Sequence, residues 1–271
     1  MGVAAVDRTV SLIEAMAGEA EAQEISRLAA RAGLPLSAAH RILGTLVERG
    51  LVVQEPATQN YRLSLRLAVL AFRSLEARAV PDVVQEVLNR LAGRTREYCR
   101  LAIAEGDDLV WVARAQGAPA GLRYEPDMGE EIVLHATANG KAWLASMDEA
   151  RARRILAARG LEARRPLGPR AARDLATVGA HLADVRRLGY ATAIDEGEAG
   201  TAAVAVVFRA GSQPGAPVAG TISVAGPLTR VTEARLPDLV AALGDAAAEV
   251  GELWPIRAFG ESARTAREAA S

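Results

Sequence analysis

Residues 25–53 read ISRLAARAGLPLSAAHRILGTLVERGLVV, and this stretch decides the fold of the N-terminal part of the chain. Its first third carries apolar residues at helical spacing, at Ile25, Leu28, Ala29 and Ala32. Gly33 predicts a helix stop, because glycine enters the left-handed conformation without steric cost. Pro35 is suited to the start of a second helix, and Gly50 ends it before an apolar run. Two short helices, a tight turn and a strand are the layout of a helix-turn-helix.

The second helix is predicted to have an apolar inner face, made by Ala39, Ile42, Leu43, Leu46 and Val47. Its outer face carries small and polar side chains suited to a DNA major groove. The candidates for DNA contact are Ser37 (also a possible helix cap), Ala38, His40, Arg41 and Thr45. Arg41 reading a guanine would contribute about 1–3 kcal/mol of discrimination. Amphipathic helices around a glycine turn also occur in domains without a DNA partner, so the motif alone leaves both interpretations open.

The residues after the second helix favour DNA binding. A turn-rich segment, 54–60, separates two short apolar runs, which predicts a hairpin wing with Arg62 placed to contact the DNA backbone. Residues 25–66 contain six arginines against Glu48 and Glu55, a net charge of +4, whereas residues 1–24 have a net charge of −4. The basic charge is therefore local to the motif, as contact with phosphates requires.

The composition of the chain limits the classes of protein to which it can belong. The chain has 271 residues, 50% of them hydrophobic and 24% charged, with a formal charge of −1, so it is globular and not a general polycation. Lys141 is the single lysine. Cys99 is the single cysteine, which allows no internal disulfide and suits a reducing cytoplasm. No apolar run approaches the roughly 18 residues of a membrane span, so a cytoplasmic protein is expected.

The remaining elements are predicted from periodicity and turn residues. A first helix is expected over residues 6–17, with Val6, Val10 and Ile13 facing inward, and a linker helix over residues 64–80. Further helices are expected at 83–95, 139–146, 148–159, 172–188 and 232–253, and strands at 98–104, 109–115, 132–135, 190–194, 202–208 and 218–224. Strands joined by short turns, with helices grouped between them, predict an α+β fold with an antiparallel sheet. Residues 258–271 are low in complexity and expected to be disordered.

Signals of catalysis and metal binding are weak. The three histidines lie far apart in sequence, Gly140 and Lys141 lack the rest of a phosphate loop, and no nucleophile elbow surrounds Ser223. We expect no enzyme activity, no metal and no cofactor. Two segments are suited to a small molecule, although each also has an ordinary structural interpretation. The first, residues 135–142, leads into a helix start that could hold a carboxylate or simply be capped by Thr137 or Asn139.

The second segment is residues 195–200, an acidic loop that could contact a ligand or be a solvated turn. Trp111 and Trp143 could line a pocket or lie in the core.

Taken together in this order, these segments resemble the IclR family of bacterial transcriptional regulators. The resemblance rests on the helix-turn-helix and wing, the string HATANGKA at 135–142, LGY at 188–190, DE at 195–196, and SVAGP at 223–227 followed by Arg230. It implies a winged helix-turn-helix domain (1–63), a linker helix (64–80) and a GAF-like effector domain (81–257) whose antiparallel sheet is flanked by helices. It also implies homodimers or homotetramers on palindromic operator DNA, and no cofactor.

The resemblance implies a pocket for a small organic or aromatic acid or amide. It assigns Ala138, Asn139, Asp195, Glu198, Ser223 and Ala225 to that pocket, and the residue patterns add Gly140 and Trp111. We expect the ligand's carboxylate or carbonyl at the helix start, and its hydroxyl or N–H group facing Asp195 or Glu198, because ionised carboxylates only accept hydrogen bonds. The predicted function is a ligand-responsive repressor of catabolic genes. The alternatives are a metabolic enzyme with an accessory DNA-binding-like domain, or a dimerisation scaffold without a ligand.

Overall fold

The structure is a computed structural model that describes residues 3–17, 19, 21–67, 69–70, 81–126 and 130–254. The chain divides into two compact units, Met1–Ala77 and Arg78–Ser271, which we describe separately. Residues 66–67 and 69–70 are helical, as expected at the start of the linker helix. The rest of that helix from residue 71, and the tail at 258–271, lie outside the described residues, so both remain predictions.

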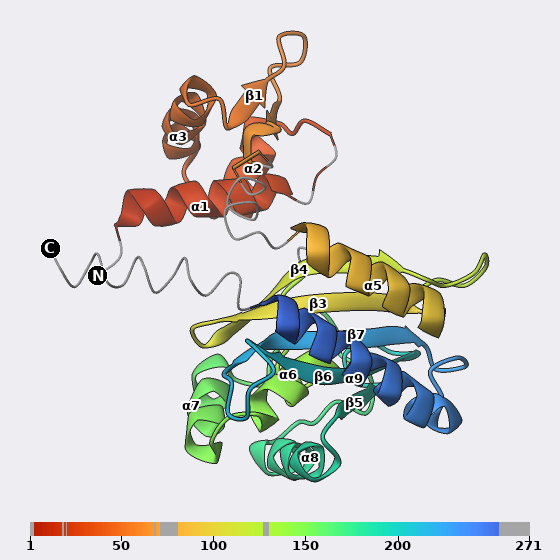
Figure 1. Ribbon diagram of the computed structural model, residues 1–271. Helices are drawn as coiled ribbons and strands as arrows, with labels where there is room; N and C mark the ends of the chain where they lie inside the picture. The colour runs from red at the N-terminus through yellow and green to blue at the C-terminus, as the bar shows by residue number, and fades with distance from the viewer. Residues whose placement is uncertain are drawn as a thin grey trace, which may run out of the picture. The chain divides into compact units, whose positions relative to one another are not determined.

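The N-terminal unit has the predicted helix-turn-helix and wing (Figure 1). Its elements are α1 (Ala4–Ala17), α2 (Ile25–Arg31), α3 (Leu36–Glu48), β1 (Val52–Gln54) and β2 (Tyr61–Leu63). Gly33 and Gly50 follow α2 and α3 with φ angles of +64° and +68°, so both helices end at glycines in the left-handed region. Strands β1 and β2 pair antiparallel, which confirms the hairpin.

The inward face of α1 differs from the prediction. Val6 and Val10 are 58% and 47% exposed, whereas Ile13 packs against the core as predicted, beside the buried Leu12, Ala15 and Met16. Two apolar stripes run along this helix, and periodicity alone cannot tell which one faces the core. The same holds at the end of α3, where Val47, predicted to face inward, is 36% exposed.

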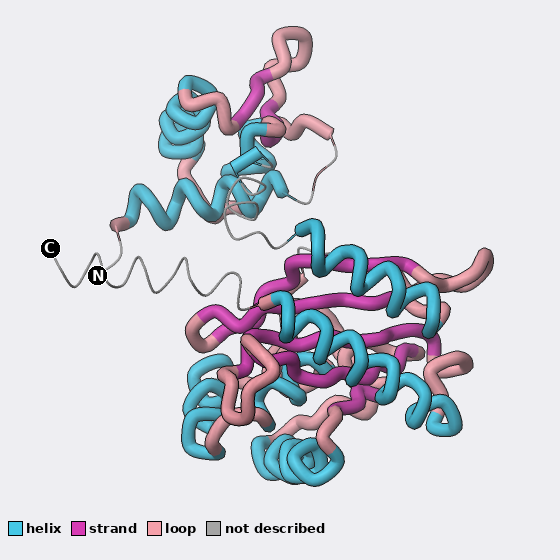
Figure 2. The backbone as a smooth tube through the Cα atoms, in the orientation of Figure 1, coloured by secondary structure: helices cyan, strands magenta, loops and turns pink. Residues whose placement is uncertain are grey.

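The C-terminal unit is a five-stranded antiparallel sheet between two layers of helices (Figure 2). The strands are β3 (Tyr98–Glu105), β4 (Asp108–Gln116), β5 (Ala191–Ile194), β6 (Thr201–Arg209) and β7 (Val218–Pro227), in the spatial order β4-β3-β7-β6-β5. The helices are α5 (Pro81–Thr95), α6 (Ala138–Ala145), α7 (Glu149–Arg159), α8 (Leu175–Leu188) and α9 (Leu236–Leu253), and a short 3-10 turn, η1 (Glu233–Arg235), precedes α9. Helices α5 and α9 cover one face, and α6 packs on the other with α7 and α8 behind it (Figure 1). The predicted α+β class is confirmed.

The predicted strand at 132–135 is wrong. The backbone turns there, and the N–H groups of Ala136 and Thr137 both donate to the carbonyl of Val133. This turn brings the chain back over the start of α6. A Cβ atom at Gly140 would lie 2.3 Å from the carbonyl oxygen of Leu134, so only glycine allows the approach.

The pleat of the sheet divides its side chains between two hydrophobic layers. Residues such as Leu101, Ile222 and Val224 pack against α5 and α9, where the larger core lies. Cys99 belongs to this core, and burial raises the pKa of its thiol to about 12. Among the described helices, none is long and apolar enough to cross a membrane.

Candidate functional site

The sheet face that points toward α6 forms the floor of a pocket. Arg100 of β3 pairs with Ser223 of β7, and Ala225 of β7 pairs with Ala203 of β6, so these side chains share one face. Ala193 of β5 pairs with Ala203 and extends the row. Most of these side chains are small, and the space they leave is not filled by α6.

The pocket, here called the α6 pocket, contains about 550 Å³ free of protein atoms, including its open mouth. Its lining comes from all five strands of the sheet, the start of α6 and three loops: Arg100, Trp111, Tyr124, Glu130, Glu131, Ile132, Ala136, Thr137, Ala138, Asn139, Arg165, Ala193, Gly197, Glu198, Thr201, Ala203, Ser223 and Ala225. A partly apolar cavity with a few convergent polar groups is typical of a small-molecule site.

A β-bulge turns Trp111 into this pocket. The register between β3 and β4 shifts at Leu101 and Ala102, where Leu101 pairs with Ala113 but Ala102 pairs with Trp111. Val112 and Ala113 consequently both pack toward α5 and α9. A bulge inserts one extra residue and reverses the faces beyond it, so the indole of Trp111 lies on the α6 side.

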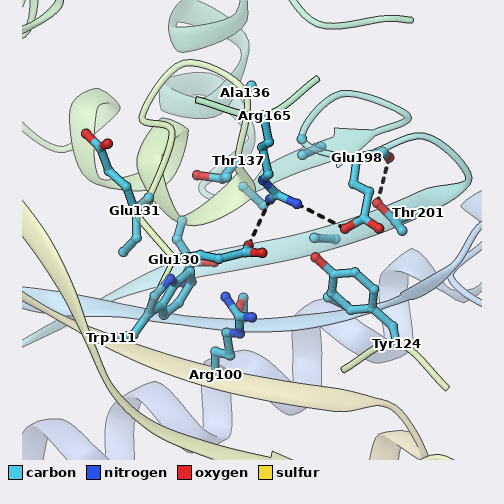
Figure 3. A pocket seen from close by; sticks show the side chains of 18 residues that line it. Arg100, Trp111, Tyr124, Glu130, Glu131, Ala136, Thr137, Arg165, Glu198 and Thr201 are labelled. Atoms are coloured by element: carbon cyan, nitrogen blue, oxygen red, sulfur yellow. Dashed lines mark hydrogen bonds and ion pairs between the residues drawn. The ribbon is translucent and has the colours of Figure 1, made fainter. Parts of the chain in front are cut away.

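Arg100 brings a positive charge to the floor of the α6 pocket. Its guanidinium carbon lies 4.5 Å from the ring centre of Trp111 and 5.2 Å from that of Tyr98. Its Nε donates to the Tyr98 hydroxyl at 3.4 Å. Figure 3 shows Arg100 rising between the rings of Trp111 and Tyr124. The residue is 7% exposed, so a carboxylate beside it would interact in a medium of low dielectric.

Charged side chains also surround the mouth of the α6 pocket. Arg165 lies between Glu130 and Glu198, with N–O distances of 3.3 and 3.2 Å (Figure 3). The hydroxyl of Tyr124 lies nearby, and burial is the main reason that its pKa is raised above its usual range. The pocket therefore has a cation at its floor and a cluster with an excess of carboxylates at its mouth.

The start of α6 is capped by its own sequence. Thr137 is the N-cap residue, and its hydroxyl accepts from the N–H of Gly140 at 3.1 Å, one of the two ordinary interpretations of this segment. Asn139 lines the pocket, but its side-chain nitrogen donates to the Thr221 hydroxyl at 2.9 Å. Gly140 is not part of the lining, because it packs against the backbone of Leu134.

Asp195 also lies outside the lining. Its backbone has a φ of +60°, and its carboxylate accepts from the N–H of Gly200 at 2.7 Å, which closes the loop before β6. The geometry therefore corrects the expectation that Asp195 faces a ligand: its carboxylate shapes the loop, and Glu198 reaches the pocket.

A buried ion pair holds this loop against α6. The ammonium of Lys141 lies 2.7 and 2.6 Å from the two carboxylate oxygens of Glu196, and the side chains are 3% and 9% exposed. Burial lowers the pKa of Lys141, and Glu196 partly opposes that effect. His135 is also buried, and burial followed by the charge of Lys141 lowers its pKa. Its Nε2 and the Nδ1 of His181 have no hydrogen-bond partner among the described residues.

The structure thus brings six of the eight predicted pocket residues together: Trp111, Ala138, Asn139, Glu198, Ser223 and Ala225. Their role in effector binding stays a prediction. Sequence reasoning missed Arg100, Tyr124 and Arg165. Arg100 stands inside the apolar run YCRLAIA, and that position was a usable signal for a functional residue. Arg165 lies among many other arginines, so its sequence gives no such signal.

The outer face of α3 forms the second candidate site. Ser37, His40, Arg41 and Thr45 are exposed there, as predicted, and Arg62 is exposed on β2 of the wing, 3.7 Å from Glu55. Two details are corrected. Ala38 is buried against the core, so its side chain does not lie on the outer face. Ser37 is not the helix cap, since α3 begins at Leu36 after Pro35.

The basic charge of the helix-turn-helix is partly balanced within the unit. Arg27 and Arg31 of α2 both pair with Glu19, which comes from the acidic segment before the motif. No ion pair is found for Arg41 among the residues that the structure describes, and its charge is exposed on α3. Within the same described ranges, no group of histidine, cysteine and acidic side chains could hold a metal ion.

Both units of the chain match known family models. Residues 5–56 match the IclR helix-turn-helix domain, and residues 72–252 match the C-terminal domain of the bacterial transcriptional regulator IclR.

Two curated relatives come from Escherichia coli strain K12. The transcriptional repressor IclR is 27% identical over 253 residues, covering 92% of this chain and 89% of the relative. The HTH-type transcriptional regulator KdgR is 29% identical over 249 residues, covering 92% and 91%.

Solved structures show the same fold. An IclR transcriptional regulator from Alicyclobacillus acidocaldarius superposes with a TM-score of 0.78 at 25% identity, covering 93% of this chain and 98% of that one. An IclR homologue from Microbacterium hydrocarbonoxydans, solved in complex with 4-hydroxybenzoate, gives a TM-score of 0.71 at 26% identity, with coverage of 92% and 98%.

Proposed function

Since this chain belongs to the IclR family of DNA-binding transcriptional regulators, we propose that it represses catabolic genes. A small aromatic acid or amide, bound in the α6 pocket, changes its affinity for operator DNA. Members of this family are regulators and not enzymes, so the alternative of a metabolic enzyme is set aside. The observation that carries the proposal is the distribution of charge in the α6 pocket, with Arg100 at the floor and Glu198 at the mouth.

The effector is a molecule with two different ends. A carboxylate or carbonyl meets Arg100, which supplies several N–H donors in a nearly dry environment. This placement revises the expected one at the start of α6, where Thr137 already accepts from the N–H of Gly140. The rest of the molecule lies over the small side chains of the sheet and against the indole of Trp111.

The far end of the effector carries a hydroxyl or N–H group. Glu198 and Glu130 at the mouth accept hydrogen bonds but cannot donate them when ionised. A ligand without such a donor would remove water from a carboxylate without replacing its hydrogen bond, at a cost of about 1–3 kcal/mol. The complex of a homologue with 4-hydroxybenzoate, an acid with a hydroxyl at the opposite end, supports this class.

Operator recognition belongs to α3 and the wing. Arg41, His40, Thr45 and Ser37 read the major groove, and Arg62 contacts the DNA backbone. The chain acts as a homodimer or homotetramer on a palindromic operator. The effector regulates because it binds two arrangements of the assembly with unequal affinity, since equal affinity would shift nothing.

The test uses fluorescently labelled DNA from the region beside the gene of this protein. The purified protein is titrated into this DNA at a series of salt concentrations, and binding is measured by fluorescence anisotropy. 4-Hydroxybenzoate is the first probe, and benzoate is its matched control. Specific binding that 4-hydroxybenzoate alters supports the proposal. Salt-sensitive binding with no preference over random DNA would overturn specific operator recognition.

Two variants assign the effect to the α6 pocket. Arg100→Gln is expected to keep its DNA affinity and to bind 4-hydroxybenzoate about ten- to 150-fold more weakly, because one charge-assisted contact is lost. Arg153→Gln changes an exposed arginine of α7 and is expected to match the wild type in both assays. Equal losses in these two variants would contradict the placement of the effector at Arg100.

A further inference from the structure

The mouth of the α6 pocket is crossed by three charged side chains from segments far apart in sequence. Glu130 precedes α6, Arg165 lies between α7 and α8, and Glu198 follows β5. Arg165 contacts both carboxylates, at 3.3 and 3.2 Å, as the dashed lines in Figure 3 show. We call these three residues the mouth strap.

The mouth strap lies between solvent and the floor of the pocket. Its side chains are 30–44% exposed. The floor residues Arg100 and Ser223 are buried. The mouth strap therefore borders the part of the pocket that reaches water, together with the exposed Glu131.

Two of the three segments, the loops that carry Arg165 and Glu198, are joined to each other at their bases. The N–H groups of Gly168 and Arg170 donate to the carbonyls of Glu196 and Asp195, at 2.7 and 2.9 Å. A Cβ atom at Gly168 would lie 2.2 Å from the Asp195 carbonyl oxygen, so the two backbones are in close contact. Glu196 is in turn held by Lys141.

The tips of these two loops are joined by the half-exposed ion pair of Arg165 and Glu198, and a second pair joins Arg165 to Glu130. Exposed pairs of this kind contribute little free energy and weaken further in salt. The arrangement combines a rigid base with a contact that opens and closes readily. A weak contact on a rigid base at the mouth of a cavity is what a gate requires.

We propose that the mouth strap is a gate: Arg165 closes the α6 pocket by bridging Glu130 and Glu198, and the bridge opens whenever a ligand enters or leaves. The inference rests on the proposed effector pocket for its purpose. Two carboxylates and one guanidinium also leave one net negative charge at the mouth, so Arg165 limits the repulsion that an incoming acid meets.

The experiment measures access to Trp111 with acrylamide, a neutral quencher, at constant ionic strength and without effector. All variants carry Trp254→Phe, and each is paired with a Trp111→Phe version so that the Trp111 signal is obtained by difference. Arg165→Gln is expected to raise the quenching constant of Trp111 about two- to fivefold, because the bridge is lost in every molecule. Arg153→Gln, which removes an exposed pair with Glu149 on α7, is the matched control and is expected to change nothing.

A second measurement needs no variant of the mouth strap. At about 1 M salt, exposed ion pairs are screened, so quenching in the otherwise unmutated protein is expected to rise toward the value of Arg165→Gln. The variant itself is expected to respond little to salt. Unchanged quenching in Arg165→Gln that folds with the control's melting temperature would overturn the gate, and so would an equal rise in Arg153→Gln.

The effector assay separates this inference from the proposed function. With 4-hydroxybenzoate as the probe, Arg165→Gln is expected to speed dissociation by a similar two- to fivefold factor, about as much as it raises quenching. Failure of the ligand to bind any variant would overturn the proposed effector class and leave the quenching result standing. Unchanged quenching with normal ligand binding would overturn the gate alone.

Discussion

The buried ion pair between Lys141 and Glu196 predicts a large loss of stability when only one partner is changed. In Glu196→Gln, the ammonium of Lys141 loses a carboxylate whose two oxygens lie 2.6 and 2.7 Å away. The side chains are 3% and 9% exposed, so water cannot take the carboxylate's place. The variant is left with a charge that is neither solvated nor paired.

The expected cost follows from this burial. Breaking a buried pair by removing one partner costs about 3–5 kcal/mol, and no discount for solvent screening applies here. For a domain of this size, each kcal/mol lowers the melting temperature by about 2–4 °C, which gives a total of about 6–20 °C. Lys141→Met/Glu196→Gln is the matched control, because it removes both charges and keeps an acceptor for the N–H of Ile194. It is expected to recover most of the loss.

The loss should also depend on pH. Burial lowers the pKa of Lys141 from its ordinary value of 10.5, and removing Glu196 lowers it further. Between the folded and unfolded pKa values, the unfolded chain binds more protons, so stability rises with pH. The destabilisation by Glu196→Gln should therefore be smaller at about pH 9.5 than at about pH 7.

The free energy of unfolding of the wild type and of both variants is measured at both pH values by urea unfolding followed by circular dichroism. A cost below about 1 kcal/mol for Glu196→Gln at neutral pH, which is the size of an exposed pair, would refute the reasoning. A double variant as unstable as Glu196→Gln would refute it as well.

Three further predictions concern other parts of the chain. The pKa of His135 is lowered in the folded protein, so on acidification the unfolded chain takes up the proton first. The free energy of unfolding should therefore fall by up to about 1.4 kcal/mol per pH unit below about pH 6.5. Thermal unfolding of His135→Gln should show a smaller dependence of stability on pH. Gly168→Ala should cost about 1–3 kcal/mol of stability, because its Cβ would meet the Asp195 carbonyl. Gly179→Ala is the control and should be neutral or stabilising, because a Cβ there has nothing within 4 Å. Equal melting temperatures of the two variants would contradict the close contact. Arg41→Ala should lose its preference for operator over random DNA. Arg62→Ala should weaken binding to both DNAs about equally and reduce the slope of log affinity against log salt concentration by about 1. An equal loss of affinity for both DNAs in Arg41→Ala would contradict its base-reading role.

Local signals predicted the N-terminal unit well. Gly33 and Gly50 end their helices in the left-handed region, as their positions in the sequence indicated. The turn-rich segment before Tyr61 gave the hairpin. These features depend on backbone preferences of single residues, which a sequence states directly. The wrong stripe of α1 shows the limit: its burial depends on which neighbours pack against it, and no local pattern encodes them.

In the α6 pocket, too, residues within recognisable local strings could be predicted, and residues brought in by the fold could not. The small residues Ala138, Ser223 and Ala225 were found through the resemblance, since they lie in recognisable strings. Trp111 reaches the pocket only through a bulge, which the alternation of a strand does not reveal. Arg165 comes from a loop with no periodicity, and its partners are separated from it by more than thirty residues of chain. Such long-range pairings follow from the fold and cannot be predicted from spacing.

The burial of Cys99 has a practical consequence. Its thiol lies in the core between the sheet and the helices α5 and α9, with a pKa raised to about 12, so at neutral pH almost none of it is the thiolate that reacts with maleimides. New cysteines placed on exposed positions of α3 and α7 can therefore be labelled selectively with fluorophores while the native cysteine stays in place. Energy transfer between such labels would report whether DNA or effector changes the distance between the two units.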